Sequence, residues 1–300
     1  MNTILKVNGL TRKYGSKTAL NNVTFSVEKG RIYGFIGENG AGKTTAIRAI
    51  TGLSEVPEGT IELFGASDRK SILKARKKMG YLVEHPILSM NETAWRNLKM
   101  QQLLYGKKDK AKIGQVLERV GLADAGKKKV RNFSLGMKQR LGIAMALVND
   151  PEILILDEPV NGLDPMGMVA VRELLKSLCA EDGITIVISS HILAELYQLV
   201  TDYIIISHGE IIEQISKEEL ERKCTSYIVI ETEQPQKAIK VLESCGLKDV
   251  ELDGDTIKIH DKVEEKKVAT IMFNASIILT QLTRFEKSLE DHYIELLGRR

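Results

Sequence analysis

A single glycine-rich stretch constrains this chain more than any other. The stretch GENGAGKTT, residues 37–45, follows the apolar run IYGFI and precedes a segment in which Ile47 and Ile50 have helical spacing. It fits G-x-x-x-x-G-K-[ST], a loop whose backbone N–H groups surround a phosphate, whose lysine reaches the outer phosphates and whose hydroxyl contacts Mg²⁺. Because the stretch lies between an expected strand and an expected helix, the sequence predicts a phosphate-binding loop.

The apolar pattern predicts an α/β domain over residues 1–218. Short strands are expected between residues 3 and 36, and an all-helical insert is expected over about 86–148. Further strands are predicted at 58–65, 79–84, 152–158, 184–190 and 203–207. Because the last three are each preceded by a helix, they favour a parallel core sheet with crossover helices.

Beyond residue 218 the pattern becomes that of a small α+β domain, residues 219–300. The expected elements are strand 226–232, helix 235–245, a hairpin through Asp253-Gly254, helix 262–273 and strand 276–283. This β-α-β-β-α-β order is typical of a ferredoxin-like sandwich. A final helix is expected to pack back as a brace, with Leu289, Tyr293, Leu296 and Leu297 at helical spacing.

The sequence of this small domain indicates a non-catalytic role. It contains no phosphate loop, no metal-ligand cluster and no basic-aromatic stripe. Its hairpin edges and its final helix offer apolar surface, which favours a brace that holds two copies of the chain together. The alternative is a sensor domain that changes turnover when it binds a small ligand.

Composition limits the environments in which the chain works. It has 43 basic and 40 acidic residues and a net charge of +3, so no global field attracts it to nucleic acid or lipid. Cys179, Cys224 and Cys245 form no C-x-x-C pair, as in a reduced, intracellular protein. No apolar run reaches the roughly 20 residues of a membrane span, and the N-terminus shows no hydrophobic signal core. We therefore expect any membrane role to come through a partner.

Polar side chains follow two of the predicted parallel strands. The strand ILILDE ends in Asp157 and Glu158, and His191 follows the next strand. The carboxyl ends of parallel strands meet at the edge where an α/β sheet binds its ligand. Asp157 suits a metal shell, and Glu158 could orient and deprotonate an attacking water. A lone histidine is more often a core residue, but its place beside a phosphate site favours a functional one.

A second anion site is predicted at a helix start. The stretch FSLGMKQRL, residues 133–141, places Ser134 and Gly136 before an amphipathic pattern. Helix N-termini carry free N–H groups and a partial positive charge, and they therefore attract anions. No second phosphate loop lies nearby, so the residues alone leave open which anion is bound and on which molecule.

These motifs together resemble those of the ATP-binding cassette (ABC) ATPases over residues 1 to about 218. They occur in the family's order: Tyr14, the loop 37–45, a polar residue at 84, the signature 133–137, ILILDE, the NGLD turn 161–164 and His191. The resemblance implies a P-loop NTPase cassette with a parallel core sheet, an antiparallel β subdomain and a helical insert. It also implies ATP and Mg²⁺ as ligands.

The resemblance implies a role for each matching residue. The nucleotide would be held by Tyr14, Gly37, Asn39, Gly40, Gly42, Lys43, Thr44 and Thr45. Tyr14 would stack on adenine, Asp164 would organise the dimer contact and His191 would touch the γ-phosphate. In a head-to-tail homodimer, Ser134 and Gly136 would bind the γ-phosphate of ATP held by the other cassette.

Two departures from the family pattern refine the resemblance. The signature has Leu135 and Met137 where the family usually has a glycine and a glutamine. Glu84 stands where the family generally has a glutamine, so a carboxylate would make that residue's catalytic and metal contact, beside Thr44 and Asp157 on the metal. With the small C-terminal domain, the chain resembles the bacitracin-resistance and lantibiotic-immunity exporters.

The resemblance therefore implies a cytoplasmic motor subunit, peripheral on the inner face of the membrane. It would hydrolyse ATP to power export of an antimicrobial peptide or drug through a separate permease, with Trp95 and Leu98 of the insert as candidates for the docking groove. The alternative is a soluble ABC ATPase acting on DNA or ribosomes, but such relatives usually carry coiled-coil insertions or two cassettes. A nucleotide kinase would leave ILILDEPVNGLDP without a role.

Overall fold

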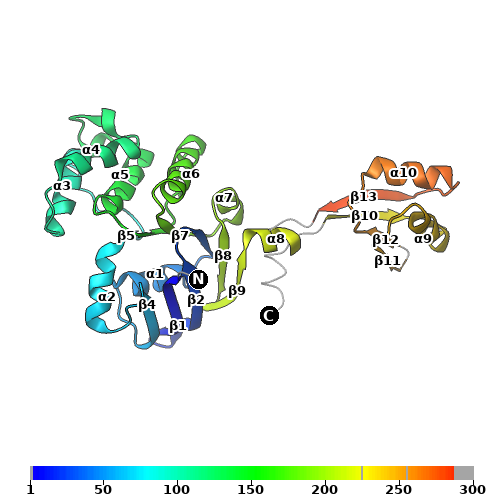
Figure 1. Cartoon of the computed structure of the whole chain (residues 1–300), viewed down its shortest axis with the longest axis horizontal. Coiled ribbons are helices and arrows are strands. Elements are labelled where there is room, and N and C mark those ends of the chain that lie inside the picture. The colour runs from blue at the N-terminus through cyan, green and yellow to red at the C-terminus, as the bar shows by residue number, and fades with distance from the viewer. Residues whose placement is uncertain (1–2, 224–225, 255, 287–300) are drawn as a thin grey trace. The chain divides into compact units, whose positions relative to one another are not determined.

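The computed structural model describes residues 3–223, 226–254 and 256–286 (Figure 1). The chain divides into two compact units, residues 1–217 and 218–300. This division lies one residue before the boundary predicted from the sequence. In the first unit, a mixed sheet carries the phosphate loop, and an antiparallel sheet packs beside it.

The mixed sheet has the strand order β5-β6-β7-β3-β8-β9. Its strands are β3 (Ile32–Ile36), β5 (Met79–Leu82), β6 (Ile153–Asp157), β7 (Thr185–Ser190), β8 (Asp202–Ser207) and β9 (Glu210–Ser216). Neighbours from β5 to β8 are parallel, and β9 is antiparallel to β8. Every residue of β3, β6, β7 and β8 is buried, as expected for strands covered on both faces. Strand β9 was not predicted from the sequence.

The antiparallel sheet has the order β2-β1-β4. It comprises β1 (Thr3–Tyr14), β2 (Lys17–Glu28) and β4 (Glu58–Leu63). One apolar core joins this sheet to helix α1 (Lys43–Thr51) and to the mixed sheet. The rings of Phe25 and Phe35, from the two sheets, have centroids 5.6 Å apart. Figure 1 shows α1 and the antiparallel sheet on one side of the mixed sheet, and α5 and α6 on the other.

Helices of the insert follow β5 and return the chain to β6. They are α3 (Ala94–Leu104), α4 (Lys110–Arg119) and α5 (Leu135–Leu147), all within the range predicted for the insert. Each begins at a polar cap, because the side chains of Thr93, Asp109 and Ser134 accept a backbone N–H of the first turn. Leu98 is fully buried in this packing. Its proposed place in a docking groove is therefore wrong, whereas Trp95 is partly exposed.

Two further helices of the first unit connect strands of the mixed sheet. They are α6 (Pro165–Ala180) and α7 (Leu193–Tyr197), while α8 (Lys217–Lys223) begins at the division between the units. Helix α2 (Arg69–Ala75) was missed in the sequence, although the Asp68 carboxylate caps it by accepting the N–H groups of Lys70 and Ser71. No helix in the described residues is long and apolar enough to cross a membrane.

The second unit follows the predicted β-α-β-β-α-β order. Its elements are β10 (Ser226–Glu231), α9 (Pro235–Ser244), β11 (Val250–Asp253), β12 (Thr256–Ile259), α10 (Glu265–Asn274) and β13 (Gln281–Glu286). The strands form a sheet in the order β11-β12-β10-β13, with all neighbours antiparallel. Apolar residues of both helices and of β10 and β12 form its core.

The last strand of the second unit begins later than predicted. The sequence suggested residues 276–283, but β13 begins at Gln281. After α10, Ser276 takes a left-handed φ of 55° and Ile277 turns into the core, so the apolar run starts as a loop. The predicted final helix with Leu289, Tyr293, Leu296 and Leu297 lies outside the described residues, as does Cys224. Cys179 and Cys245 are free thiols.

Candidate nucleotide site

The glycines of the phosphate loop allow close backbone approaches. The loop joins β3 to α1, and Gly42 before the helix has a φ of 112°, a left-handed value that favours glycine. A Cβ on Gly42 would lie 2.7 Å from the carbonyl oxygen of Ala19. A Cβ on Gly37 would lie 2.4 Å from the carbonyl oxygen of Ile206. Both positions therefore need glycine.

The side chain of Lys43, the first residue of α1, reaches back into the phosphate loop. Its side chain is only 5% exposed, and Nζ donates to the carbonyl oxygens of Gly37 at 2.6 Å and Glu38 at 3.2 Å. Burial lowers the pKa of Lys43, and the negative charges of Glu158 and Asp157 oppose that shift. The loop therefore holds one buried ammonium group where a phosphate needs a cation.

Thr44 and Asp157 form an oxygen pair beside this lysine. The Thr44 hydroxyl donates to Oδ2 of Asp157 at 2.9 Å, across 113 residues of sequence. Hydroxyl and carboxylate oxygens are ligands that suit Mg²⁺, which takes one or two protein groups and completes its shell with phosphate oxygens and water. The residues present thus fit Mg²⁺. Among the described residues there is no group of three His, Cys, Asp or Glu side chains that could hold a metal ion.

Glu158 is held from several directions. It has a left-handed φ of 47°, which is uncommon for a residue with a side chain. Oε2 lies 3.1 Å from Nδ1 of His191 and accepts the Asn161 amide at 3.1 Å, while Oε1 lies 3.7 Å from Nζ of Lys43. The Glu158 backbone N–H donates to the Ser189 hydroxyl at 2.9 Å. This carboxylate therefore has a fixed orientation beside the loop.

A cleft of about 280 Å³ opens over the loop. Its lining residues are Tyr14, Lys17, Ala19, Asn39, Gly40, Gly42, Lys43, Thr44, Thr45 and Glu158. The Tyr14 ring is half exposed, and the Arg12 guanidinium lies 5.0 Å from its centroid. A smaller hollow of about 120 Å³ adjoins Glu158 and includes Asn161 and His191. The structure thus brings together most of the residues predicted for a nucleotide, and Lys17 joins them.

Other predicted residues lie away from this cleft in the single chain. Ser134 caps α5 by accepting the Met137 N–H at 3.2 Å, and it does not line the cleft, nor does Gly136. Asp164 caps α6 by accepting the Gly167 N–H at 3.1 Å. The Glu84 carboxylate pairs with the Arg48 guanidinium at 2.6 Å, and Glu84 does not line the cleft. The roles assigned to these residues stay predictions.

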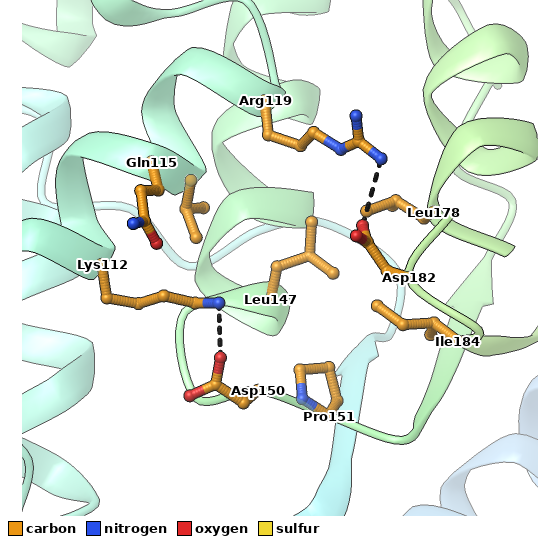
Figure 2. Close-up of a pocket in the computed structure, with 10 residues that line it drawn as sticks. Lys112, Gln115, Arg119, Leu147, Asp150, Pro151, Leu178, Asp182 and Ile184 are labelled. Carbon is orange, nitrogen blue, oxygen red and sulfur yellow. Dashed lines mark hydrogen bonds and ion pairs between the residues drawn. The ribbon is translucent and has the colours of Figure 1, made fainter. Parts of the chain in front are cut away.

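A larger cavity, of about 330 Å³, lies elsewhere in the first unit (Figure 2). Its apolar floor includes Leu147, Leu178 and Ile184. Lys112 of α4 pairs with Asp150 after α5, and Arg119 of α4 pairs with Asp182 after α6 at 3.1 Å. Each cation at the rim is thus matched by a carboxylate, which makes this cavity a poor match for phosphate.

Sequence comparisons show what this chain is similar to. The family model described as ABC transporter matches residues 20–161. The chain is 41% identical to the bacitracin transport ATP-binding protein BcrA of Bacillus licheniformis, over 99% of this chain and 98% of that protein. It is 42% identical to the lantibiotic transport ATP-binding protein SrtF of Streptococcus pyogenes, over 76% of this chain and 99% of that protein.

Solved structures show the same cassette. The structure of cbiO1 from Clostridium perfringens, part of the ABC transporter complex cbiONQ, has a TM-score of 0.67 at 28% identity and covers 74% of this chain and 92% of that one. A dimeric ATP-binding cassette bound to ADP and Pi has a TM-score of 0.64 at 26% identity, with 71% and 99% covered. This likeness concerns the cassette. The description of the second unit as ferredoxin-like stays a prediction.

Proposed function

This chain belongs to the ABC transporter ATP-binding proteins and is an ABC ATPase, and from that premise we propose that it powers export of an antimicrobial peptide or drug through a separate permease. One observation carries the proposal: the match to BcrA extends through both units, over 99% of this chain. The match to SrtF, another transport ATP-binding protein, supports the same substrate class.

In the proposed reaction, ATP lies in the cleft over the loop. The loop N–H groups and Lys43 bind its phosphates, and the exposed Tyr14 ring stacks on its base. Thr44 and Asp157 would hold Mg²⁺, which would neutralise charge on the phosphates. Glu158 orients a water and accepts its proton, and His191 keeps the Glu158 carboxylate turned toward the cleft.

We place the second half of each site on a partner copy. Ser134 and Gly136 lie at the N-terminus of α5, outside the cleft of their own chain, so they are free to bind the γ-phosphate held by the other copy. This arrangement is a head-to-tail homodimer. A dimeric cassette among the similar structures supports dimer formation and leaves the head-to-tail detail as our proposal.

Mixed dimers test this arrangement. One chain carries Lys43→Ala and the other carries Ser134→Ala, so that one composite site loses both groups and the other stays intact. Each homodimer is expected to be inactive, and mixing the two is expected to restore part of the hydrolysis. If heterodimers form and hydrolysis stays absent, the head-to-tail arrangement is wrong.

We infer that the chain works at the cytoplasmic face of the membrane, bound to its permease. Expression in a sensitive host, with the permease and with either the wild-type chain or Glu158→Gln, tests the export proposal. Only the wild-type chain is expected to lower drug or peptide accumulation in the cells. Co-purification with a membrane protein is the expected companion result, whereas co-purification with ribosomes or DNA alone would favour the soluble alternative.

A further inference from the structure

A single buried hydroxyl links the two acidic residues of the site. Ser189, near the end of β7, is fully buried and pairs in register with Asp157 of β6. Its O–H donates to Oδ1 of Asp157 at 2.5 Å, and its oxygen accepts the backbone N–H of Glu158 at 2.9 Å. The same oxygen therefore contacts two consecutive residues that have different proposed tasks.

We propose that Ser189 is a positioning residue for ATP hydrolysis, which sets the metal-binding carboxylate and the general base together. The proposal rests on the proposed roles of Asp157 and Glu158. Ser189 touches neither ATP nor the attacking water. It acts through the two residues that do.

The hydrogen bond to Asp157 determines which oxygen remains for the metal. With Oδ1 bound to Ser189, Oδ2 faces the Thr44 hydroxyl at 2.9 Å. Without that bond the carboxylate could rotate about its last torsion, which is a broad one. The hydrogen bond from Ser189 to the Asp157 carboxylate is also stronger than one between two neutral groups, because the acceptor is charged. Ser189 thus fixes the oxygen pair that suits Mg²⁺.

The hydrogen bond from Glu158 supports an unusual backbone. At a φ of 47° Glu158 has left the strand, and its N–H donates to the Ser189 side chain. A left-handed residue with a side chain persists only where its surroundings hold it. Ser189 holds the backbone, while Asn161 and His191 hold the Oε2 atom. Both the backbone and the carboxylate of Glu158 are therefore held in place.

The competing interpretation is that Ser189 only satisfies buried polar groups. Thr185 provides a matched comparison, because it lies on the same strand and is also fully buried. Its hydroxyl accepts the backbone N–H of Gly30 at 2.9 Å, away from the site residues. Thr185→Val removes that hydroxyl with little change in shape, so it measures the cost of losing a buried hydroxyl from β7.

The test uses the full-length chain with two readouts. Ser189→Ala is expected to lower kcat by about 10- to 100-fold, the loss typical of one hydrogen bond to a charged group. It should also weaken binding of a fluorescent ATP analogue several-fold in Mg²⁺ and leave binding in EDTA unchanged. Thr185→Val is expected to change neither readout, although its melting temperature should fall. Ser189→Cys, which keeps only a weak donor, should give intermediate values and serves if Ser189→Ala does not fold.

Two results would overturn the proposal. One is a Ser189→Ala protein with kcat and Mg²⁺-dependent binding within about twofold of the wild type, a change smaller than any hydrogen bond to a charge is worth. The other is equal loss of both readouts in Thr185→Val. Failure of the base assignment is separate: Glu158→Gln would then keep hydrolysing, while the Mg²⁺-dependent binding defect of Ser189→Ala would persist.

Discussion

The first unit gathers its predicted site residues at one edge of a sheet, while the strands of the second unit end at both edges of theirs. In the first unit, β3, β6 and β7 run parallel, so Lys43, Asp157, Glu158 and His191 all lie at or after strand ends on the same side. In the second unit all neighbouring strands are antiparallel, so the carboxyl ends of adjacent strands lie at opposite edges of the sheet. The comparison teaches that strand direction decides where side chains can converge.

Electrostatics separates the two units in the same way. The Lys43 ammonium is buried beside Glu158 and Asp157 in the first unit. In the described residues of the second unit, the ion pairs such as Arg284–Glu265 and Lys258–Asp253 have partly or largely exposed carboxylates. Exposed pairs hold elements together weakly and leave no charge free for a ligand. The buried charges of the first unit face its cleft, whereas the role of the second unit as a support stays a prediction.

The largest expected effect is the loss of ATP hydrolysis when Glu158, at the carboxyl edge of the mixed sheet, is replaced. Glu158→Gln keeps the shape of the side chain and loses the base, so hydrolysis should fall by about 10²- to 10⁴-fold. ATP binding should be retained, and an ATP-stabilised dimer should accumulate. Phosphate release and size measurement with ATP and Mg²⁺ check both results. Near-normal hydrolysis would show that the edge does not supply the base.

Removing the second unit tests whether it is a support. A chain ending after Glu218 is expected to bind ATP within about twofold of the full chain, because every residue lining the cleft lies before that point. Dimerisation should weaken by about 10²-fold, since linked contacts raise the effective concentration of the cassettes.

Measuring the activity of the truncated chain at several protein concentrations distinguishes a dimer brace from a sensor domain. Activity lost on truncation should return at high protein concentration if the second unit is a dimer brace. Activity that stays low at every concentration would favour the sensor alternative. Loss of ATP binding would mean that the two units are not separable.

A smaller effect is expected on the stability of the second unit at acidic pH, through the ion pair of Glu265 with Arg284. The Arg284 guanidinium lowers the pKa of Glu265 to about 2, from an ordinary 4.5. Because this pKa is depressed by folding, the stability it contributes is present above pH 4.5 and is lost as the pH falls toward 2. The melting temperature of Glu265→Gln should therefore lie below that of the wild type at pH 7, and the two should converge near pH 2. A constant difference across that range would rule out this ion pair as the cause.

The smallest effect is expected at the cavity of Figure 2. Arg119 pairs with Glu181 at 2.8 Å and Asp182 at 3.1 Å, and all three side chains are partly exposed. Arg119→Ala should lower the free energy of unfolding by less than about 1 kcal/mol, and the difference should shrink in high salt. Urea unfolding at two salt concentrations measures it. ATPase activity should stay unchanged, because this cavity lies apart from the cleft.

Much of this comparison could be predicted from the sequence. The loop at 37–45 and the strand ILILDE determine their own local structure, so the sequence alone predicts Lys43, Thr44, Asp157 and Glu158 at one sheet edge. His191 was predicted at the same edge because it follows the next strand, ITIVISS. The placement of these residues can be predicted because each lies at or just after the end of its own strand.

The contacts between distant segments could not be predicted in this way. Ser189 meets Asp157 only because β6 and β7 pair in one particular register, and no local pattern gives that register. Arg48 pairs with Glu84 from a helix and a loop that lie 36 residues apart. In the second unit the predicted start of β13 was too early. Ile277 is apolar because it packs in the core from the loop before the strand, and not because it belongs to the strand.

The strand order of the mixed sheet has a consequence for synthesis of the chain. β3 carries the phosphate loop, yet both of its neighbours, β7 and β8, are made much later: Ile32 pairs with Ile186, and Tyr33 pairs with Asp202. The β1–β2 hairpin can close early, because its turn joins Tyr14 to Lys17. β3 must wait while about 150 further residues are translated, roughly 8–30 s at 5–20 residues per second. During that time an apolar strand with two open edges is exposed to chaperones and to other nascent chains. Both neighbours of β3 are complete only after Ser207, the last residue of β8, has been synthesised.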